Sequence, residues 1–232
     1  MTQTWSFVPS YRTLNGVQTT SGSIEGAAAE MTDEEAVRQF EAFVQGQKPA
    51  STPWQPVTDY SFEARKAIEG IHPRLIKDVF DPTLVMDVGC GPGHLVTLLR
   101  ELGVNVSGCD RTNPTADYEV DITEDDWLPF RSDLVICREV LEHLTVIQIK
   151  RAVAHLVALS SKYIYVTTRF AQQPTHLLSV DDHDDLDPTH ITMLTKPFLR
   201  TLFILEGCKS RYDLEERMDH KKLGRVLVFE VT

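Results

Sequence analysis

The feature that most constrains the fold is a short apolar run that meets three closely spaced glycines. Residues 84–88 read Leu-Val-Met-Asp-Val, and Gly89, Gly91 and Gly93 follow at alternate positions. Residues 95–100 then read as a helix. Glycine allows backbone angles that a side chain would forbid, and a helix N-terminus offers unpaired N–H groups. The pattern therefore predicts a buried strand that turns tightly into a helix, a typical nucleotide-binding unit.

Two common nucleotide-binding motifs do not match this loop. The dinucleotide motif G-x-G-x-x-G needs glycine at position 94, where the chain has His94. The phosphate loop needs Gly-Lys followed by Ser or Thr, and that sequence does not follow here. The loop reads Asp87-x-Gly89-x-Gly91-x-Gly93. It resembles motif I of the class I S-adenosylmethionine-dependent methyltransferases, and the resemblance covers about residues 60–232.

This resemblance implies a Rossmann-like α/β fold: a seven-stranded, mostly parallel sheet with helices on both faces and an antiparallel last strand. It implies S-adenosylmethionine as the cofactor, with Gly89 and Gly91 against its methionine part and Asp87 orienting its amino end. Three further positions, in the loop or at the end of a neighbouring strand, are placed with these cofactor-binding residues: Cys90, Gly93 and Arg138.

Acidic residues are expected to end the next two strands. Residues 104–109 alternate like a strand and lead to Asp110, about twenty residues after the glycine loop, as in related sites. An acid there can accept hydrogen bonds from ribose hydroxyls, although the following Asn113-Pro114 also suits a turn-capping aspartate. A short third strand ends near Asp121 and Ile122, which the resemblance implies flank the adenine. A solvated loop carboxylate is the alternative for Asp121.

The acceptor chemistry is expected beyond the fourth strand, residues 133–137, because ligands of open α/β sheets bind at the carboxyl ends of strands. The Asp/Asn-Pro-Pro-aromatic sequence of amino-directed DNA methyltransferases and the Pro-Cys nucleophile of cytosine-C5 enzymes are missing there. The chain has Glu139-Val-Leu-Glu142-His143 instead. This Glu-x-x-Glu-His resembles the small-RNA 3′-terminal 2′-O-methyltransferases and the ubiquinone-pathway O-methyltransferases.

In both families the two glutamates and the histidine are implicated in holding a divalent metal near the acceptor hydroxyl. The small-RNA family adds a histidine after the fifth strand, so the implied ligands are Glu139, Glu142, His143 and His190. Magnesium or manganese would lower the pKa of a bound hydroxyl. Metal-free interpretations stay open, because Glu142 and His143 can instead shape the acceptor pocket. Either His143 or His190 could also act as a general base.

Composition limits the class of protein. The chain has 232 residues, 42% of them hydrophobic, which is enough for one substantial α/β core. No apolar run is long enough to span a bilayer, the N-terminus lacks a signal-peptide pattern, and the four cysteines lack zinc-type spacing. We therefore expect a cytoplasmic protein with reduced thiols and no membrane partner. The net charge of −11 disfavours extended nucleic-acid binding but still allows a local basic groove.

Two regions are expected along the chain. Residues 1–56 are interpreted as a flexible tail with a short amphipathic helix near 32–44 and a Pro-rich linker, and residues 57–232 as the methyltransferase domain. An Asp-rich run at 181–187 is interpreted as a solvated lid, with binding of a metal or a cationic acceptor as the alternative. The elements expected after residue 137 are helices at 146–160 and 196–206 and strands at 162–167, 208–212 and 225–231.

The sequence thus predicts an S-adenosylmethionine-dependent methyltransferase whose acceptor is a hydroxyl of a small molecule or sugar. Two alternatives remain beside it. One is a metal-dependent RNA 2′-O-methyltransferase, which the negative net charge disfavours. The other is a cofactor-binding but catalytically silent subunit, which would dock a partner through the amphipathic segment of the N-terminal tail.

Overall fold

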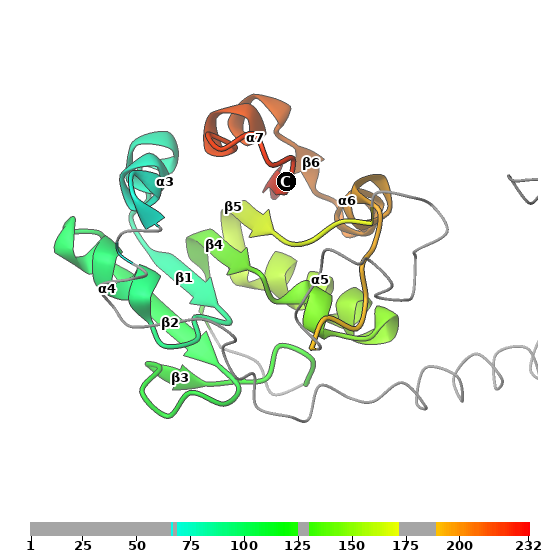
Figure 1. The fold of residues 1–232 in the computed structure, drawn as a ribbon, viewed down its shortest axis with the longest axis horizontal. Helices are drawn as coiled ribbons and strands as arrows, with labels where there is room; N and C mark the ends of the chain where they lie inside the picture. Colours follow the sequence, from blue (N-terminus) through cyan, green and yellow to red (C-terminus); the bar gives the residue numbers. More distant parts are fainter. Residues whose placement is uncertain (1–65, 67–68, 125–129, 172–188) are drawn as a thin grey trace, which may run out of the picture. The chain divides into compact units, whose positions relative to one another are not determined.

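The computed structural model of the chain describes residues 66, 69–124, 130–171 and 189–232. These residues form seven strands: β1 (Val85–Val88), β2 (Val106–Asp110), β3 (Tyr118–Glu119), β4 (Ser132–Arg138), β5 (Ser160–Thr167), β6 (Lys209–Ser210) and β7 (Val226–Glu230). They build one sheet in the order β3-β2-β1-β4-β5-β7-β6 (Figure 1). β7 runs antiparallel to both of its neighbours, and the other pairs are parallel. This confirms the predicted Rossmann-like sheet.

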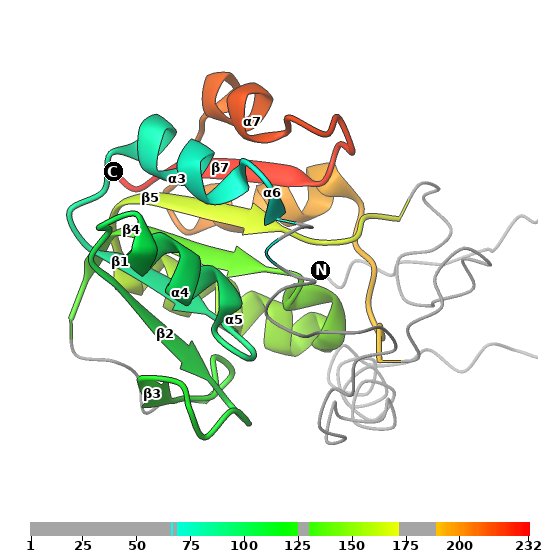
Figure 2. The same cartoon turned by 60° about the vertical axis from the view of Figure 1, so that its left-hand side comes forward.

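Helices cover both faces of the sheet. They are α3 (His72–Phe80), α4 (His94–Glu101), α5 (Val146–Leu159), α6 (Lys196–Leu205) and α7 (Tyr212–Met218), with a 3-10 turn η1 (Leu141–His143). α3, α4 and α7 share one apolar cluster with the sheet, and α5 and α6 share the other (Figure 2). β1 lies between β2 and β4 with all four residues buried, as expected for a parallel strand covered on both faces.

The connection between β4 and β5 shows why the chain folds locally as it does. Thr145 caps α5, because its hydroxyl accepts from the backbone N–H of Gln148 while the Gln148 side chain accepts from the Thr145 N–H. This reciprocal cap satisfies two N–H groups that a helix start otherwise leaves unpaired. It fixes the point where α5 begins, directly after η1.

One prediction for the C-terminal part is wrong. The strand predicted at 208–212 is only Lys209–Ser210 in the structure, and Tyr212 instead begins α7. Charged residues obscure the short apolar pattern of this helix. One of them, Glu215, is buried because it accepts two hydrogen bonds from Arg200 at 2.7 and 2.9 Å. Such a pairing compensates a buried charge and leaves no trace in the hydrophobic periodicity.

Several sequence predictions lie outside the described residues. They are the N-terminal tail with its amphipathic helix, the Pro-rich linker and the Asp-rich run. Within the part of the chain that the structure describes, every helix is too short or too polar to cross a bilayer.

The core beneath α6 can be tested with a matched pair of phenylalanines. Phe203 is fully buried and stacks on Phe229 with ring centroids 4.2 Å apart, whereas Phe198 on the same helix is 43% exposed. We expect Phe203→Ala to lower the free energy of unfolding by about 3–5 kcal/mol, because it leaves a cavity. Phe198→Ala should change it by roughly 0.5 kcal/mol or less. Urea unfolding measures both, and equal losses would contradict this packing.

Candidate functional site

The candidate site lies at the edge of the sheet where β1, β2, β4 and β5 end (Figure 2). β1 pairs with β4 in parallel, with Asp87 opposite Ile136 and Val88 opposite Cys137. Because the two strands end level with each other, the loop after β1 and the turn after β4 leave the sheet side by side. The glycine loop and the Glu-x-x-Glu-His segment therefore belong to one site.

The glycine loop follows β1 as predicted, with positive φ at all three glycines: 71° at Gly89, 52° at Gly91 and 76° at Gly93, which caps α4. The surroundings of these glycines differ. A Cβ on Gly89 would come within 2.3 Å of Val140 Cγ2, whereas a Cβ on Gly91 would meet no atom within 4 Å among the described residues. Gly89 therefore makes room for a neighbouring side chain, and Gly91 leaves the open approach that a ligand could use.

Asp110 stands at the end of β2, where its carboxylate organises the loop. Its Oδ2 accepts from the Gly91 N–H at 2.9 Å, and its Oδ1 accepts from the backbone N–H groups of Thr112 and Asn113. The Asn113 side chain donates to the Gly91 carbonyl. Asp110 therefore caps a turn and orders the glycine loop. A carboxylate has about four acceptor positions, so Oδ2 keeps capacity for a ligand hydroxyl.

Asp121 and Ile122 follow β3 on the same edge. Asp121 caps a turn by accepting from the N–H and hydroxyl of Thr123, and it lies 3.5 Å from Arg111 in an ion pair. Ile122 is buried in the core next to β2 and α5. The local contacts explain why Asp121 is at this position, and they leave its predicted role beside the adenine as a prediction.

Asp87 is the acid of the predicted motif, and it is buried one residue before the end of β1. It makes no side-chain hydrogen bond within the described residues. Burial raises its pKa to about 7, and the positive charge of Arg138 opposes that rise. A buried carboxyl without a partner is costly in its charged form, so Asp87 is suited to receive a cationic group.

Arg138 ends β4 and pairs with a residue that the sequence analysis did not single out. Its guanidinium donates to both carboxylate oxygens of Glu69, at 3.1 and 3.2 Å. Its Nε–H is buried and has no partner among the described residues. The Arg138 Nε–H is therefore a charged donor close to the glycine loop, and a ligand carboxylate is a suitable acceptor for it.

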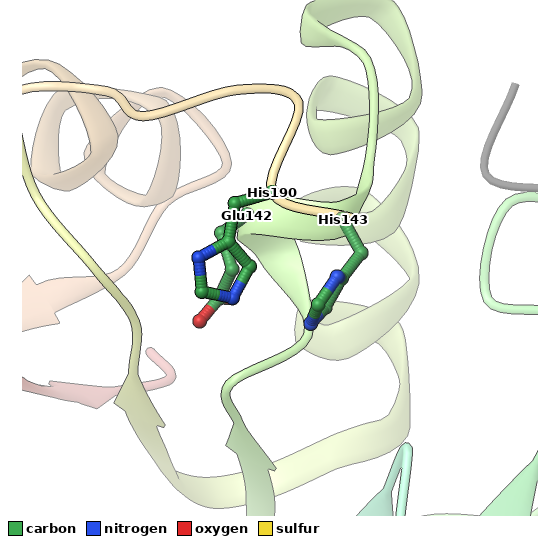
Figure 3. A group of neighbouring side chains, drawn as sticks. All are labelled: Glu142, His143 and His190. Carbon is green, nitrogen blue, oxygen red and sulfur yellow. The ribbon is translucent and has the colours of Figure 1, made fainter. Parts of the chain in front are cut away.

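Three of the four predicted acceptor-side residues come together after β4 and β5. The ligand atoms of Glu142, His143 and His190 all lie within 4.8 Å of one another (Figure 3). The ring centroids of His143 and His190 are 4.8 Å apart. Backbone bonds place His190 there, because Ile191 and Thr192 N–H groups donate to the Glu142 carbonyl. A contact of nearly fifty residues in sequence separation thus completes the cluster.

Glu142 is buried at the centre of this cluster. Its Oε2 accepts from the Thr168 hydroxyl at 2.7 Å, and its Oε1 is buried without a hydrogen-bond partner in the described part of the chain. Burial raises the pKa of Glu142 well above its ordinary value, and the nearby Glu139 carboxylate adds to the rise. Either a proton or a bound cation would remove the cost of the buried charge.

Glu139 is the fourth predicted residue, and it is not in the cluster of ligand atoms. It is exposed and has a φ of 52°, a left-handed backbone that is unusual for a residue with a side chain. Its N–H donates to the Thr167 carbonyl at 2.8 Å. Backbone strain of this kind is maintained only where surrounding contacts enforce it, and here it ends β4 and starts the turn toward η1.

The orientation of His143 follows from its contacts. Its Nδ1 lies 3.2 Å from the Thr189 carbonyl oxygen and 2.9 Å from the Thr189 hydroxyl. A carbonyl oxygen only accepts, so Nδ1 carries the proton in the bond to it. In the neutral ring Nε2 is then the atom with the lone pair.

The site also contains residues that sequence reasoning missed. They are Glu69, which pairs with Arg138, Val140, which fills the space beside Gly89, and Thr168, which holds Glu142. The only signal for Glu69 was its spacing of three from His72 on a helical segment, a weak pattern by itself. Val140 and Thr168 follow the ends of β4 and β5, and their contacts exist only in the folded chain.

Comparisons with known proteins identify a family for the chain. A family model described as "Methyltransferase domain" matches residues 61–209, more than half of the chain. No curated protein matches the sequence.

Three solved structures resemble the chain. CalS10, an amino pentose methyltransferase from Micromonospora echinaspora solved with SAM bound, has a TM-score of 0.52 and 18% identity, covering 84% of this chain and 97% of that one. An O-methyltransferase family protein from Burkholderia thailandensis has a TM-score of 0.53 and 13% identity, covering 86% of this chain and 62% of that one. Human N-acetylserotonin methyltransferase in complex with SAM has a TM-score of 0.48 and 17% identity, covering 73% of this chain and 54% of that one. The chain thus spans about half to two thirds of the last two proteins. The first two similarities show the fold.

The fit of Val140 beside Gly89 predicts a coupled pair of substitutions. Gly89→Ala should lower the free energy of unfolding by about 2–5 kcal/mol, through backbone strain and overlap with Val140. Gly91→Ala, in open space, should cost only the strain of about 1–2 kcal/mol.

Adding Val140→Ala to Gly89→Ala should relieve the overlap. We expect the double variant to lose about 1–3 kcal/mol less than the sum of the two single losses, measured in a double-mutant cycle by urea unfolding. Simple additivity would mean that Val140 does not occupy the space beside Gly89.

Proposed function

The chain belongs to the methyltransferase-domain family, and on this premise we propose that it transfers a methyl group from S-adenosylmethionine to a hydroxyl of a small molecule or sugar. The observation that carries the proposal is the meeting of two half-sites at one strand edge: the open, acid-flanked glycine loop after β1, and the glutamate–histidine cluster after β4. We place the catalytic domain at residues 57–232.

The cofactor half-site fits the charges of S-adenosylmethionine. Its amino group and sulfonium are cationic, and Asp87 is a buried carboxyl without a hydrogen-bond partner in the described residues. The carboxylate of S-adenosylmethionine would accept from the buried Nε–H of Arg138, and the ribose hydroxyls of the cofactor would donate to Asp110. Gly91 leaves room for it, with Cys90, Gly93, Asp121 and Ile122 as further lining. CalS10, of the same fold, was solved with SAM bound.

The acceptor half-site fits a hydroxyl nucleophile. In the transfer, the acceptor oxygen forms a bond to the methyl carbon while the bond from that carbon to sulfur breaks. The hydroxyl proton leaves to a base, for which His143 Nε2 or His190 is suited. The sulfonium is already activated, so most of the protein's contribution is alignment and exclusion of water.

A metal-dependent form of the same reaction is the second candidate. The supporting observation is the buried Glu142 Oε1 without a partner in the described residues, within 4.8 Å of two imidazole ligand atoms. One carboxylate and two imidazoles fit manganese better than magnesium. Glu142, His143 and His190 would hold the ion, with the Glu139 carboxyl as the neighbour of Glu142. A bound ion would supply a more acidic acceptor hydroxyl.

Cofactor binding is tested first, by calorimetric titration with S-adenosylmethionine. Asp110→Asn should weaken binding about 10- to 100-fold, because it removes a charged acceptor worth roughly 1.5–3 kcal/mol. Asp133→Asn is the matched control, since Asp133 also accepts from two backbone N–H groups, at 2.7 Å, but at the opposite end of β4. Equal effects of the two variants, or no binding by the wild type, would contradict the assignment.

Catalysis is tested by following transfer of labelled methyl to a panel of sugars and phenols. His143→Ala and His190→Ala are compared. The variant that removes the general base should lower kcat about 100-fold, with cofactor affinity unchanged. Loss of activity in EDTA that manganese restores, and that Glu142→Gln abolishes, would favour the metal-dependent form. Cofactor binding without turnover of any acceptor would instead favour a non-catalytic subunit.

A further inference from the structure

A chain of buried polar side chains runs from β5 to the end of β4. The Tyr165 hydroxyl lies 2.8 Å from His72 Nε2, and His72 Nδ1 lies 3.0 Å from Glu69 Oε2. Glu69 accepts two hydrogen bonds from Arg138. Tyr165, His72 and Glu69 are each 5% exposed or less. None of the three takes part in the proposed methyl transfer, so their burial and pairing call for another role.

The direction of each hydrogen bond in the chain can be assigned. Burial alone would raise the pKa of Glu69, but the hydrogen bond from His72 and the charge of Arg138 hold it well below its ordinary value. Glu69 is therefore an ionised acceptor, and His72 Nδ1 donates to it. Burial lowers the pKa of His72 to about 4, so its Nε2 accepts from the Tyr165 hydroxyl at neutral pH. This row of hydrogen-bonded side chains carries one negative charge, on Glu69, which faces the positive charge of Arg138.

This pair of charges acts on Asp87. Residues of parallel strands that are opposite in register point to the same face, and Ile136 is the register partner of Asp87. Arg138 lies two residues further along that face. Burial raises the pKa of Asp87 to about 7; Arg138 lowers it, and Glu69 and Asp110 raise it. The neighbouring thiols stay neutral, because burial raises the pKa values of Cys90 and Cys109.

We propose that Glu69 is a positioning residue for the cofactor: it holds Arg138 next to Asp87 and attenuates its charge, and so controls how readily Asp87 receives the cationic end of the ligand. The proposal rests on the proposed S-adenosylmethionine-dependent function. His72 and Tyr165 keep Glu69 in place from α3 and β5. With Glu69 present, Asp87 without ligand is mostly neutral only below about pH 7, and binding of a cation there displaces its proton.

The first arm of the test needs no ligand. The full chain is labelled with ¹³C-aspartate, and the Asp87 carboxyl signal is identified by its loss in Asp87→Asn. We expect a titration midpoint near 7 in the wild type. Glu69→Gln should lower this midpoint by about one pH unit, because a negative charge that disfavours ionised Asp87 is removed.

Glu215→Gln is the matched control. Glu215 is equally buried and accepts two hydrogen bonds from Arg200, but this pair joins α6 to α7 away from the glycine loop. It should leave the Asp87 midpoint unchanged. A wild-type midpoint near 4, or the same shift in both variants, would overturn the proposal. A wild-type midpoint near 4 would overturn the proposal even if Glu69→Gln fails to fold.

The second arm measures S-adenosylmethionine affinity at pH 6 and pH 8. With a midpoint lowered by about one unit, Asp87 is about five times more often ionised at pH 6, so Glu69→Gln should bind about fivefold tighter there. The gain should vanish at pH 8, where Asp87 is ionised in both proteins. A purely structural role for Glu69 would weaken binding equally at both pH values and would overturn the proposal.

The two arms separate the possible failures. If the wild type binds no S-adenosylmethionine at either pH, the proposed function fails, while the Asp87 titration still decides whether Glu69 controls the charge of Asp87. If the cofactor binds but Glu69→Gln moves neither the midpoint nor the pH dependence of affinity, only the role of Glu69 is rejected.

Discussion

The parallel pairing of β1 with β4 is the interaction on which the site depends. It sets Asp87 opposite Ile136 and Val88 opposite Cys137, so the segments that leave the two strands start from one level. Val140 then packs beside Gly89, where only a glycine leaves room for it. This contact joins the glycine loop directly to the turn that carries Glu142 and His143. Displacing one half-site would therefore displace the other.

Two buried carboxyls mark the two halves of the site, and their surroundings prepare them for different partners. Burial raises the pKa of both Asp87 and Glu142. Asp87 faces the charge of Arg138 and makes no hydrogen bond in the described residues, which suits a mobile cationic ligand. Glu142 is held by Thr168 and lies among imidazoles, which suits a fixed role with a proton or a metal ion. The same physical effect, desolvation, thus serves both halves.

The fold was predictable because its main signals are local. The glycine loop, the alternation of strands and helices, and the acid at the end of β2 can all be read from short stretches of sequence, and each matches the sheet. The exception is α7. Its buried Glu215 is neutralised by Arg200 of a different helix, so the segment lacks the apolar pattern of a buried helix. A pairing between helices cannot be read from either segment alone.

The sequence by itself predicted alternating strands and helices, the place of the glycine loop and the types of side chain after the fourth strand, because these follow from glycine conformations and hydrophobic periodicity, and its resemblance to a known family implied the Rossmann-like fold. Only the tertiary structure decided which of those side chains meet. It brought His190 to Glu142 and His143 but left Glu139 outside their cluster. It also paired Arg138 with Glu69, a residue without a motif. Such contacts depend on strand register and loop closure, which act between residues far apart in the chain.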